Sequence, residues 1–151
     1  MGKQSAGLLL YRIPNHTIEV FLVHPGGPFF AKKDNGSWSI PKGEFNDDED
    51  ALTAAKREFE EETGKPIDGN FIKLHPIRQK SGKTVHAWAV EGDIDHTNIT
   101  SNTFEIEWPP RSGKRKTFPE IDRAGWFTLH EAKEKLIPAQ IKLVEELESI
   151  L

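Results

Sequence analysis

The sequence of 151 residues contains no cysteine, so the chain has neither a disulfide framework nor a thiolate metal site. No apolar run approaches the roughly 20 residues that a helix needs to cross a membrane. The N-terminus lacks the basic, apolar and small-residue pattern of a signal peptide, and Ala6 stands where a myristoylation motif requires Ser or Thr. We therefore expect a cytoplasmic protein with no membrane partner.

Basic residues are also in deficit, since the formal net charge is −4 at pH 7. This deficit argues against sequence-independent binding along a nucleic-acid backbone, and we expect no stable nucleic-acid partner. The charge is uneven: acid concentrates in residues 44–62, whereas a basic cluster consists of Arg111, Lys114, Arg115 and Lys116. Such polarity suits a polyanionic small molecule that carries its own metal ion. A solvated basic loop explains any single one of these residues equally well.

Residues 49–63 have the periodicity of an amphipathic helix. At 100° per residue, one arc suited to a core contains Leu52, Ala55, Phe59 and Thr63. On the neighbouring arc, Glu61 lies about 60° to one side of Glu58 and Glu62 about 40° to the other. Glu60 points roughly the opposite way and serves as an internal control.

Three carboxylates on one arc raise one another's pKa values unless something offsets their repulsion. A hard divalent cation, Mg²⁺ or Mn²⁺, prefers oxygen ligands and would do so. The common alternative is a glutamate-rich face that simply meets water. The wider spacing decides, because the chain matches Gly-x5-Glu-x7-Arg-Glu-x-x-Glu-Glu-x-Gly at Gly43, Glu49, Arg57, Glu58, Glu61, Glu62 and Gly64. At a usage on the order of 6% per fixed position, this match is roughly a one-in-a-million accident.

This pattern resembles the box of the Nudix hydrolase family, here residues 43–65, in which Phe59 supplies the apolar residue expected after Arg-Glu. Lys65 departs from the apolar residue expected after the last glycine, although Ile67 lies two positions on. The resemblance implies a single α/β domain, 1–151, with an α/β/α sandwich around a mixed sheet. It also implies that water attacks a phosphorus atom in a nucleoside diphosphate linked to another group.

The resemblance further implies metal ligands: the backbone oxygen of Gly43, the carboxylates of Glu58, Glu61 and Glu62, and an acidic residue six positions before a Trp. Glu120 occupies that last place, with Asp122 and Glu107 as alternatives. For the general base we favour Glu61, then Glu58, then Glu120. Arg57, one turn before Glu61, can hold a carboxylate by a forked pair of hydrogen bonds.

Substrate-binding candidates flank the box. Lys42 stands at the mouth of the site, where an ammonium group meets phosphate oxygens, and the basic cluster would stabilise charge on the same phosphates. The resemblance places Phe29, Phe30, Lys32 and Lys33 over the substrate, so the rings would stack on a base and the lysines would meet phosphate. Packing of the two phenylalanines onto the sheet is an equally good interpretation.

The remaining chain predicts the frame around this site. Strands are expected at residues 5–12 and 19–24, joined as a hairpin, and at 37–40, 71–79, 84–90 and 103–108. Gly7 indicates close approach of another backbone. Helices are expected at 130–136, after a Thr128 cap, and from Pro138 to the end, with an apolar stripe of Ile141, Val144, Leu147 and Ile150/Leu151.

Helix-end signals complete the expectation for the central helix. Residues 46–48, Asn-Asp-Asp, would supply its N-cap, and Gly64 would end it in a left-handed conformation.

The function expected from the whole is hydrolysis of a phosphoanhydride bond with Mg²⁺ or Mn²⁺, in a dinucleoside polyphosphate or a nucleoside triphosphate, by a monomer or homodimer. Alternatives are hydrolysis of ADP-ribose, of a nucleotide sugar or of a diphosphoinositol polyphosphate. A non-catalytic Nudix domain that senses a nucleotide is a different class, against which the intact glutamates argue. An acidic protein-interaction domain without a ligand requires the spacing match to be accidental.

Overall fold

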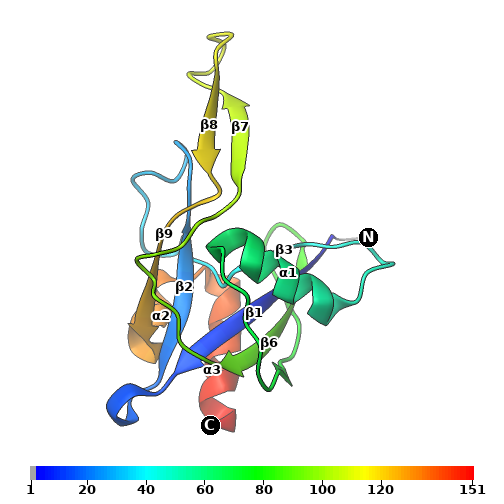
Figure 1. Ribbon diagram of the computed structural model, residues 1–151, viewed down its shortest axis with the longest axis vertical. Coiled ribbons are helices and arrows are strands. Elements are labelled where there is room, and N and C mark those ends of the chain that lie inside the picture. Colours follow the sequence, from blue (N-terminus) through cyan, green and yellow to red (C-terminus); the bar gives the residue numbers. More distant parts are fainter. Residues whose placement is uncertain (1–2) are drawn as a thin grey trace.

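A computed structural model describes residues 3–151 (Figure 1). The five strands on the main path of its sheet are, in spatial order, β4 (Ile72–Lys73), β6 (Thr84–Glu91), β1 (Gln4–Arg12), β2 (Glu19–Pro25) and β9 (Ile121–Thr128). In addition, β3 (Lys42–Glu44) pairs with β1, and β5 (Ile77–Arg78) pairs with β6. The two long inner strands, β1 and β6, run parallel, whereas β2 pairs antiparallel with β1 and with β9. The sheet is therefore mixed, as expected.

Helices cover both faces of this sheet because β1 and β2 are apolar on both sides. On one face, α1 (Ala51–Thr63) packs through a cluster that contains Ala54, Ala55, Phe59, Leu8, Leu10, Phe21 and Val23. On the other face, α2 (Leu129–Lys135) and α3 (Ile141–Ile150) close a second cluster with Leu9, Tyr11, Val20, Leu22, Leu143, Val144 and Leu147. Successive strand residues point to opposite faces, so a continuous apolar run supplies both cores. The α/β/α sandwich is confirmed.

The ends of α1 differ in part from expectation. The helix begins at Ala51, and its N-cap is Asp50, whose carboxylate accepts a hydrogen bond from the Thr53 backbone N–H at 3.0 Å. The assignment of the cap to residues 46–48 was wrong, because only the residue directly before the first turn can reach that N–H. The C-terminal prediction is confirmed, since Gly64 has φ of 77° and donates to the Glu60 carbonyl. Ile67 packs against the α1 core cluster, in the place of the apolar residue expected after that glycine.

The first hairpin, β1 with β2, is confirmed, and so is the crowding at Gly7. A Cβ there would lie 2.5 Å from the Pro41 carbonyl oxygen. Residues 37–40 do not form the expected strand. Trp38 and Ser39 make only isolated β-bridges, to Leu136 and to Val23 respectively. The backbone hydrogen bonds of this segment go to several different elements, and the Ile40 N–H donates to the Gln140 side chain. Among the described residues, no single partner strand runs beside it. A short β3 (Lys42–Glu44) follows instead and pairs with β1.

The strand expected at 71–79 is broken into β4 (Ile72–Lys73) and β5 (Ile77–Arg78), both paired to β6. Pro76 has no N–H to continue the ladder, and the His75 backbone N–H donates to Glu146. The Thr128 cap of α2 is confirmed as a capping box with Glu131.

The closing helix is preceded by a single 3-10 turn (Pro138–Gln140). Its apolar stripe ends earlier than expected, since Ile150 and Leu151 are 45% and 47% exposed. The core cluster on this face ends at Leu147, so the last turn extends beyond the sheet.

A separate two-stranded hairpin, β7 (Thr103–Glu107) with β8 (Arg115–Pro119), projects from the body of the molecule (Figure 1). Strand β7 confirms the expected strand at 103–108. Two residues of the basic cluster, Arg115 and Lys116, belong to β8 and not to a loop. Within residues 3–151, no helix has the length and apolar character of a membrane span.

Candidate active site

Strand β3 and helix α1 meet at Gly43. A Cβ at this residue would overlap the Glu58 carboxylate and would lie 2.5 Å from its Oε1 atom. The backbone cannot give way, because Gly43 is held in register opposite Ala6 of β1. Glycine is therefore required for the Glu58 carboxylate to lie against the β3 backbone, where the resemblance expects a carbonyl ligand.

Arg57 connects the acidic side chains at this end of the site. Its Nε and Nη2 atoms donate to the two carboxylate oxygens of Glu49, each at 3.0 Å. Its Nη1 atom donates to Glu58 at 2.9 Å and to Glu61 at 3.0 Å. The forked pair thus goes to Glu49, and Glu61 receives a single bond. Arg57 fixes both helix carboxylates at once, and the three glutamates raise its pKa further above the ordinary value.

Glu62 lies on the other side of Glu58 and is partly buried. Its Oε1 atom accepts a hydrogen bond from the Lys42 backbone N–H at 3.3 Å. Burial raises the pKa of Glu62 to about 8, with the Lys42 ammonium opposing and with Glu58 and Glu120 adding repulsion. Burial also raises the pKa of Glu58, with further repulsion from Glu61 and Glu120. These carboxylates need positive charge nearby in order to stay ionised.

Lys42 supplies only part of that charge. Burial and the repulsion from Lys83 lower the pKa of its ammonium group, against the attraction of Glu62, Glu44 and Glu58. An anion placed beside this half-buried ammonium group would favour its charged form.

Of the three acidic candidates, Glu120, Asp122 and Glu107, Glu120 is the one that borders the site. It lies between β8 and β9, its backbone is fixed to Asn102 and Gly26, and it lines the same cavity as Glu62. The Oδ1 atom of Asp122 instead lies 2.8 Å from Nδ1 of His24. The Glu107 carboxylate accepts hydrogen bonds from the backbone N–H groups of Arg111, at 3.0 Å, and of Gly113, at 3.2 Å.

The residues present fit a hard divalent cation by their chemistry. Glu58, Glu62 and Glu120 offer oxygen ligands only, and their mutual repulsion is what a cation would relieve. Within residues 3–151, no three His, Asp or Glu side chains already form a complete ligand cluster, and Glu61 is directed to Arg57. Glu60 is exposed, as the helical rotation predicts.

A cavity of about 470 Å³ adjoins two of these carboxylates, Glu62 and Glu120. Lys42, Glu62 and Glu120 line one side, and the loop after β2 supplies the other, including Phe30, Lys33 and Asp34. This volume lies in the range of small-molecule sites, roughly 300–1,000 Å³. The cavity is thus a candidate substrate pocket with cationic and anionic groups at its wall.

The structure separates the other substrate-binding candidates. Phe30 lines the cavity, whereas Phe29 is 62% exposed and packs edge-on against Trp108. Lys32 is exposed and outside the lining, and the neighbouring Lys33 takes part in it with its Nζ atom 5.3 Å from the Phe30 ring. A side-chain direction inside an irregular loop has no period in the sequence, so no pattern could have distinguished Lys33 from Lys32.

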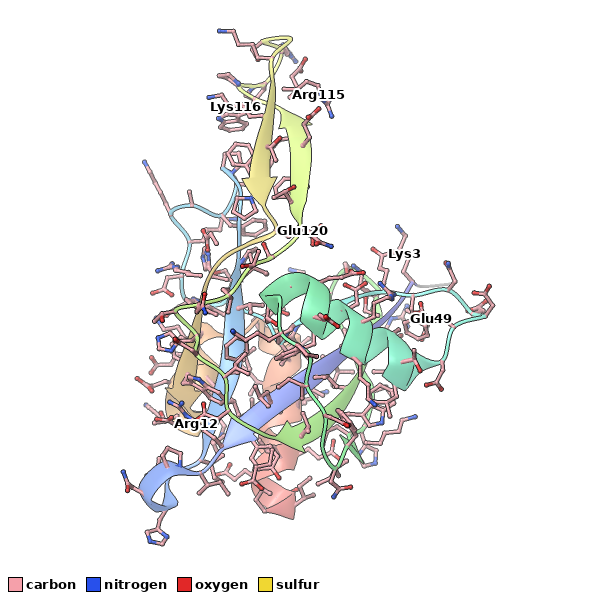
Figure 2. All side chains as sticks on the ribbon, viewed as in Figure 1. Lys3, Arg12, Glu49, Arg115, Lys116 and Glu120 are labelled. Carbon is pink, nitrogen blue, oxygen red and sulfur yellow. The ribbon has the colours of Figure 1, made fainter. Side chains whose placement is uncertain are left out.

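The basic cluster, Arg111 with residues 114–116, does not line the cavity. Figure 2 shows Arg115 and Lys116 toward the outer end of the hairpin and Glu120 at its base. Along the extended chain, Glu120 lies five residues beyond Arg115, a distance of about 17 Å. Arg115 is already paired with Glu105 at 2.6 Å.

His24 is a site-bordering residue that sequence reasoning missed. The side chain is fully buried, and its Nε2–H donates to the Lys33 carbonyl at 2.7 Å while Nδ1 meets Asp122. The imidazole therefore fastens the cavity loop to β9. The available signal was a polar residue at the end of the apolar run Val20–Val23, directly before Pro-Gly-Gly.

A family model described as NUDIX domain matches residues 3–147. Among curated proteins, none matches this sequence. Three solved structures show the same fold at low sequence identity. An Ap4A hydrolase from C. elegans, in a binary complex, is 20% identical with a TM-score of 0.69, and the match covers 98% of this chain and 96% of that one.

The other two structures are bacterial. The NUDIX domain of Shewanella oneidensis NrtR complexed with ADP ribose is 13% identical with a TM-score of 0.67, covering 99% of this chain and 88% of that one. A mutT/nudix family protein from Listeria innocua is 17% identical with a TM-score of 0.63, covering 98% and 92%. At these identities the likeness concerns the fold alone.

Proposed function

The chain belongs to the NUDIX family and is a hydrolase of pyrophosphate bonds, and from this premise we propose that it uses Mg²⁺ or Mn²⁺ to cleave a substrate containing a nucleoside diphosphate. The observation that supports this proposal best is the placement of Glu58 and Glu62 at the β3 backbone, beside a cavity that Glu120 and Lys42 also line. The proposed substrate is a dinucleoside polyphosphate or a nucleoside triphosphate.

In this proposal the Gly43 carbonyl and the carboxylates of Glu58, Glu62 and Glu120 hold the cation. When bound, the cation would supply positive charge to the phosphate oxygens and would make a nearby water more acidic. Lys42 and Lys33 face the cavity and bind the phosphates from the protein side.

Glu61 acts as the general base and accepts the proton of the attacking water, with Glu58 and then Glu120 as the next candidates. Arg57 is a positioning residue in this scheme, because its Nη1 atom holds Glu61 at 3.0 Å and Glu58 at 2.9 Å. Glu61 is more exposed than Glu58, with 37% against 12% of the side chain accessible, so it has freer access to water.

A substrate panel tests the proposal. Diadenosine tetraphosphate, 8-oxo-dGTP, ADP-ribose and a diphosphoinositol polyphosphate would each be incubated with Mg²⁺ or Mn²⁺, and the products separated by chromatography. We expect turnover of diadenosine tetraphosphate or of the triphosphate. Preference for ADP-ribose or for the inositol substrate would assign one of the alternative activities. Tight nucleotide binding without turnover of any substrate would indicate a sensor.

Matched variants of α1 identify the catalytic face. Glu61→Gln and Glu62→Gln should each lower turnover at least about a hundredfold, while Glu60→Gln, on the exposed side of the same helix, should have little effect. Equal losses from all three variants would contradict the assignment of roles. The proposal is completed by a cytoplasmic monomer or homodimer whose partner is a phosphorylated small molecule.

A further inference from the structure

The cavity continues outward along a surface that the proposed chemistry does not use. We call it the outer wall: residues 26–30 together with the β7–β8 hairpin. The two parts form one unit, because Gly26 N–H donates to the Glu120 carbonyl at 2.8 Å and a Cβ at Gly27 would lie 2.7 Å from the Phe104 ring. The outer wall therefore starts at the cavity and is fixed to it.

Aromatic side chains lie along this wall. Phe30 lines the cavity, and the next ring outward is Phe29, which is 62% exposed. The Phe29 ring meets Trp108 with centroids 5.5 Å apart and planes at 81°. Phe29 is exposed and Trp108 is half-buried, so this edge-to-face contact leaves the Phe29 ring open to a ligand, next in the chain to the cavity-lining Phe30. A planar nucleobase is the ligand that such a surface fits.

The hairpin turn beyond these rings is ordered and cationic. The Glu107 carboxylate accepts from the Arg111 and Gly113 N–H groups, and Trp108 N–H donates to the Lys114 carbonyl at 2.8 Å. Arg111 is held at φ of 62°, a conformation that few non-glycine residues adopt. In the described part of the chain, Arg111, Lys114 and Lys116 have no carboxylate within the 4.0 Å of an ion pair, whereas Arg115 has Glu105. Cations presented on an ordered turn favour a phosphate-bearing ligand.

From these observations we propose that the outer wall is the subsite for the second nucleoside of a dinucleoside polyphosphate. Phe29 and Trp108 contact its base, and the cations of the turn, which lie beyond these rings, attract the negatively charged ligand to the wall. The cavity of about 470 Å³ lies in the lower half of the range of small-molecule sites, and a ligand with two nucleosides joined by phosphates would extend beyond it along this wall. This inference rests on the proposed function and names its substrate class.

Two ligands test the subsite: diadenosine tetraphosphate and adenosine 5′-tetraphosphate, which lacks the second nucleoside and carries a free terminal phosphate in its place. Phe29→Ala and Trp108→Ala should each raise KM for the first at least about tenfold and leave KM for the second within about twofold, with kcat unchanged. Phe29→Tyr and Trp108→Phe keep a ring and should restore the wild-type KM. Phe29 is outside the hairpin strands, so its variants report on ring contact even if Trp108→Ala disturbs the turn. Equal KM changes for both ligands, or none for either, would overturn the subsite.

Removing the positive charges of the hairpin turn provides a second test of the outer wall. Replacing Arg111, Lys114 and Lys116 together by Ala should weaken the binding of both ligands, because both carry the tetraphosphate, and the loss should shrink at high salt. The control variant replaces Arg78, Lys80 and Lys142, which are exposed and lie outside the outer wall. It removes the same total charge as the turn variant. If the control variant weakens binding as much as the turn variant, the turn has no specific role.

Calorimetric titration of both ligands without divalent cation separates this inference from the proposed function. Tighter binding of diadenosine tetraphosphate that depends on Phe29, without hydrolysis when Mg²⁺ is added, would refute the function and support the subsite. Equal affinity for the two ligands, together with normal hydrolysis, would refute the subsite and support the proposed function.

Discussion

Replacing Gly43 by Ala tests how the site is built. The new Cβ would be 2.5 Å from Glu58 Oε1, inside the closest approach of two such atoms. The β3 backbone is held by its pairing with β1, whereas the carboxylate is the far end of a flexible side chain. Glu58 must therefore move, and its 2.9 Å hydrogen bond from Arg57 is lost.

The two consequences differ in size. For stability, loss of a partly exposed ion pair costs about 0–1 kcal/mol, and removing a glycine from a strand returns about 0.5–1 kcal/mol, so the net change should be below about 1 kcal/mol. For function, a displaced ligand should reduce cation affinity or kcat/KM about 10- to 100-fold. The variant should thus remain folded and become a poor enzyme.

The assay is a titration of kcat/KM with Mn²⁺, alongside thermal unfolding, for Gly43→Ala, Glu58→Ala and the double variant. Because the alanine acts through the Glu58 side chain, it should have almost no further effect once that side chain is truncated. An equally large effect in both backgrounds would refute this reasoning, as would wild-type cation affinity in Gly43→Ala.

Three further predictions follow from the contacts at the site. Arg57→Ala should lower kcat about tenfold or more and change KM little, because it releases the proposed base, while thermal stability falls by no more than about 1 kcal/mol for this partly exposed network. Without divalent cation, Glu62 has a pKa of about 8, above its value in the unfolded chain, so its contribution to stability is present at low pH and lost as pH rises toward and through 8. Unfolding temperatures measured in EDTA should show this loss in the wild type and not in Glu62→Gln, and saturating Mg²⁺ should reverse it; identical pH profiles would contradict the burial argument. Lys33→Ala should raise KM for phosphorylated substrates more than Lys32→Ala, since Lys33 lines the cavity, and steady-state kinetics with both variants would show a wrong assignment as equal KM values.

The parts of this structure that sequence could predict are those set by local spacing. Helix α1 combines a buried arc, a glycine end and acidic positions at fixed rotation, and all three properties depend only on neighbours within a few turns. Glu60 pointed away as the rotation required, and Gly64 ended the helix. The roles of the glutamates as ligands and base stay predictions.

The parts that sequence could not predict depend on distant contacts. Glu49 belongs to the spacing pattern, yet it precedes the helix and reaches Arg57 across eight residues. Residues 37–40 look like a strand by composition, but their backbone partners lie on several elements. Nothing in the sequence indicates that the β7–β8 hairpin projects outward, which moves the basic cluster away from Lys42.

Anomalous scattering from crystals grown with Mn²⁺ tests the central claim, that carboxylates of α1 hold a divalent cation against the β3 backbone. We predict one ion bound directly by the Glu58 and Glu62 carboxylates and the Gly43 carbonyl, at the edge of the cavity. Saturating Mn²⁺ with no ion at these three groups, and with Glu58 still bonded to Arg57, would contradict it.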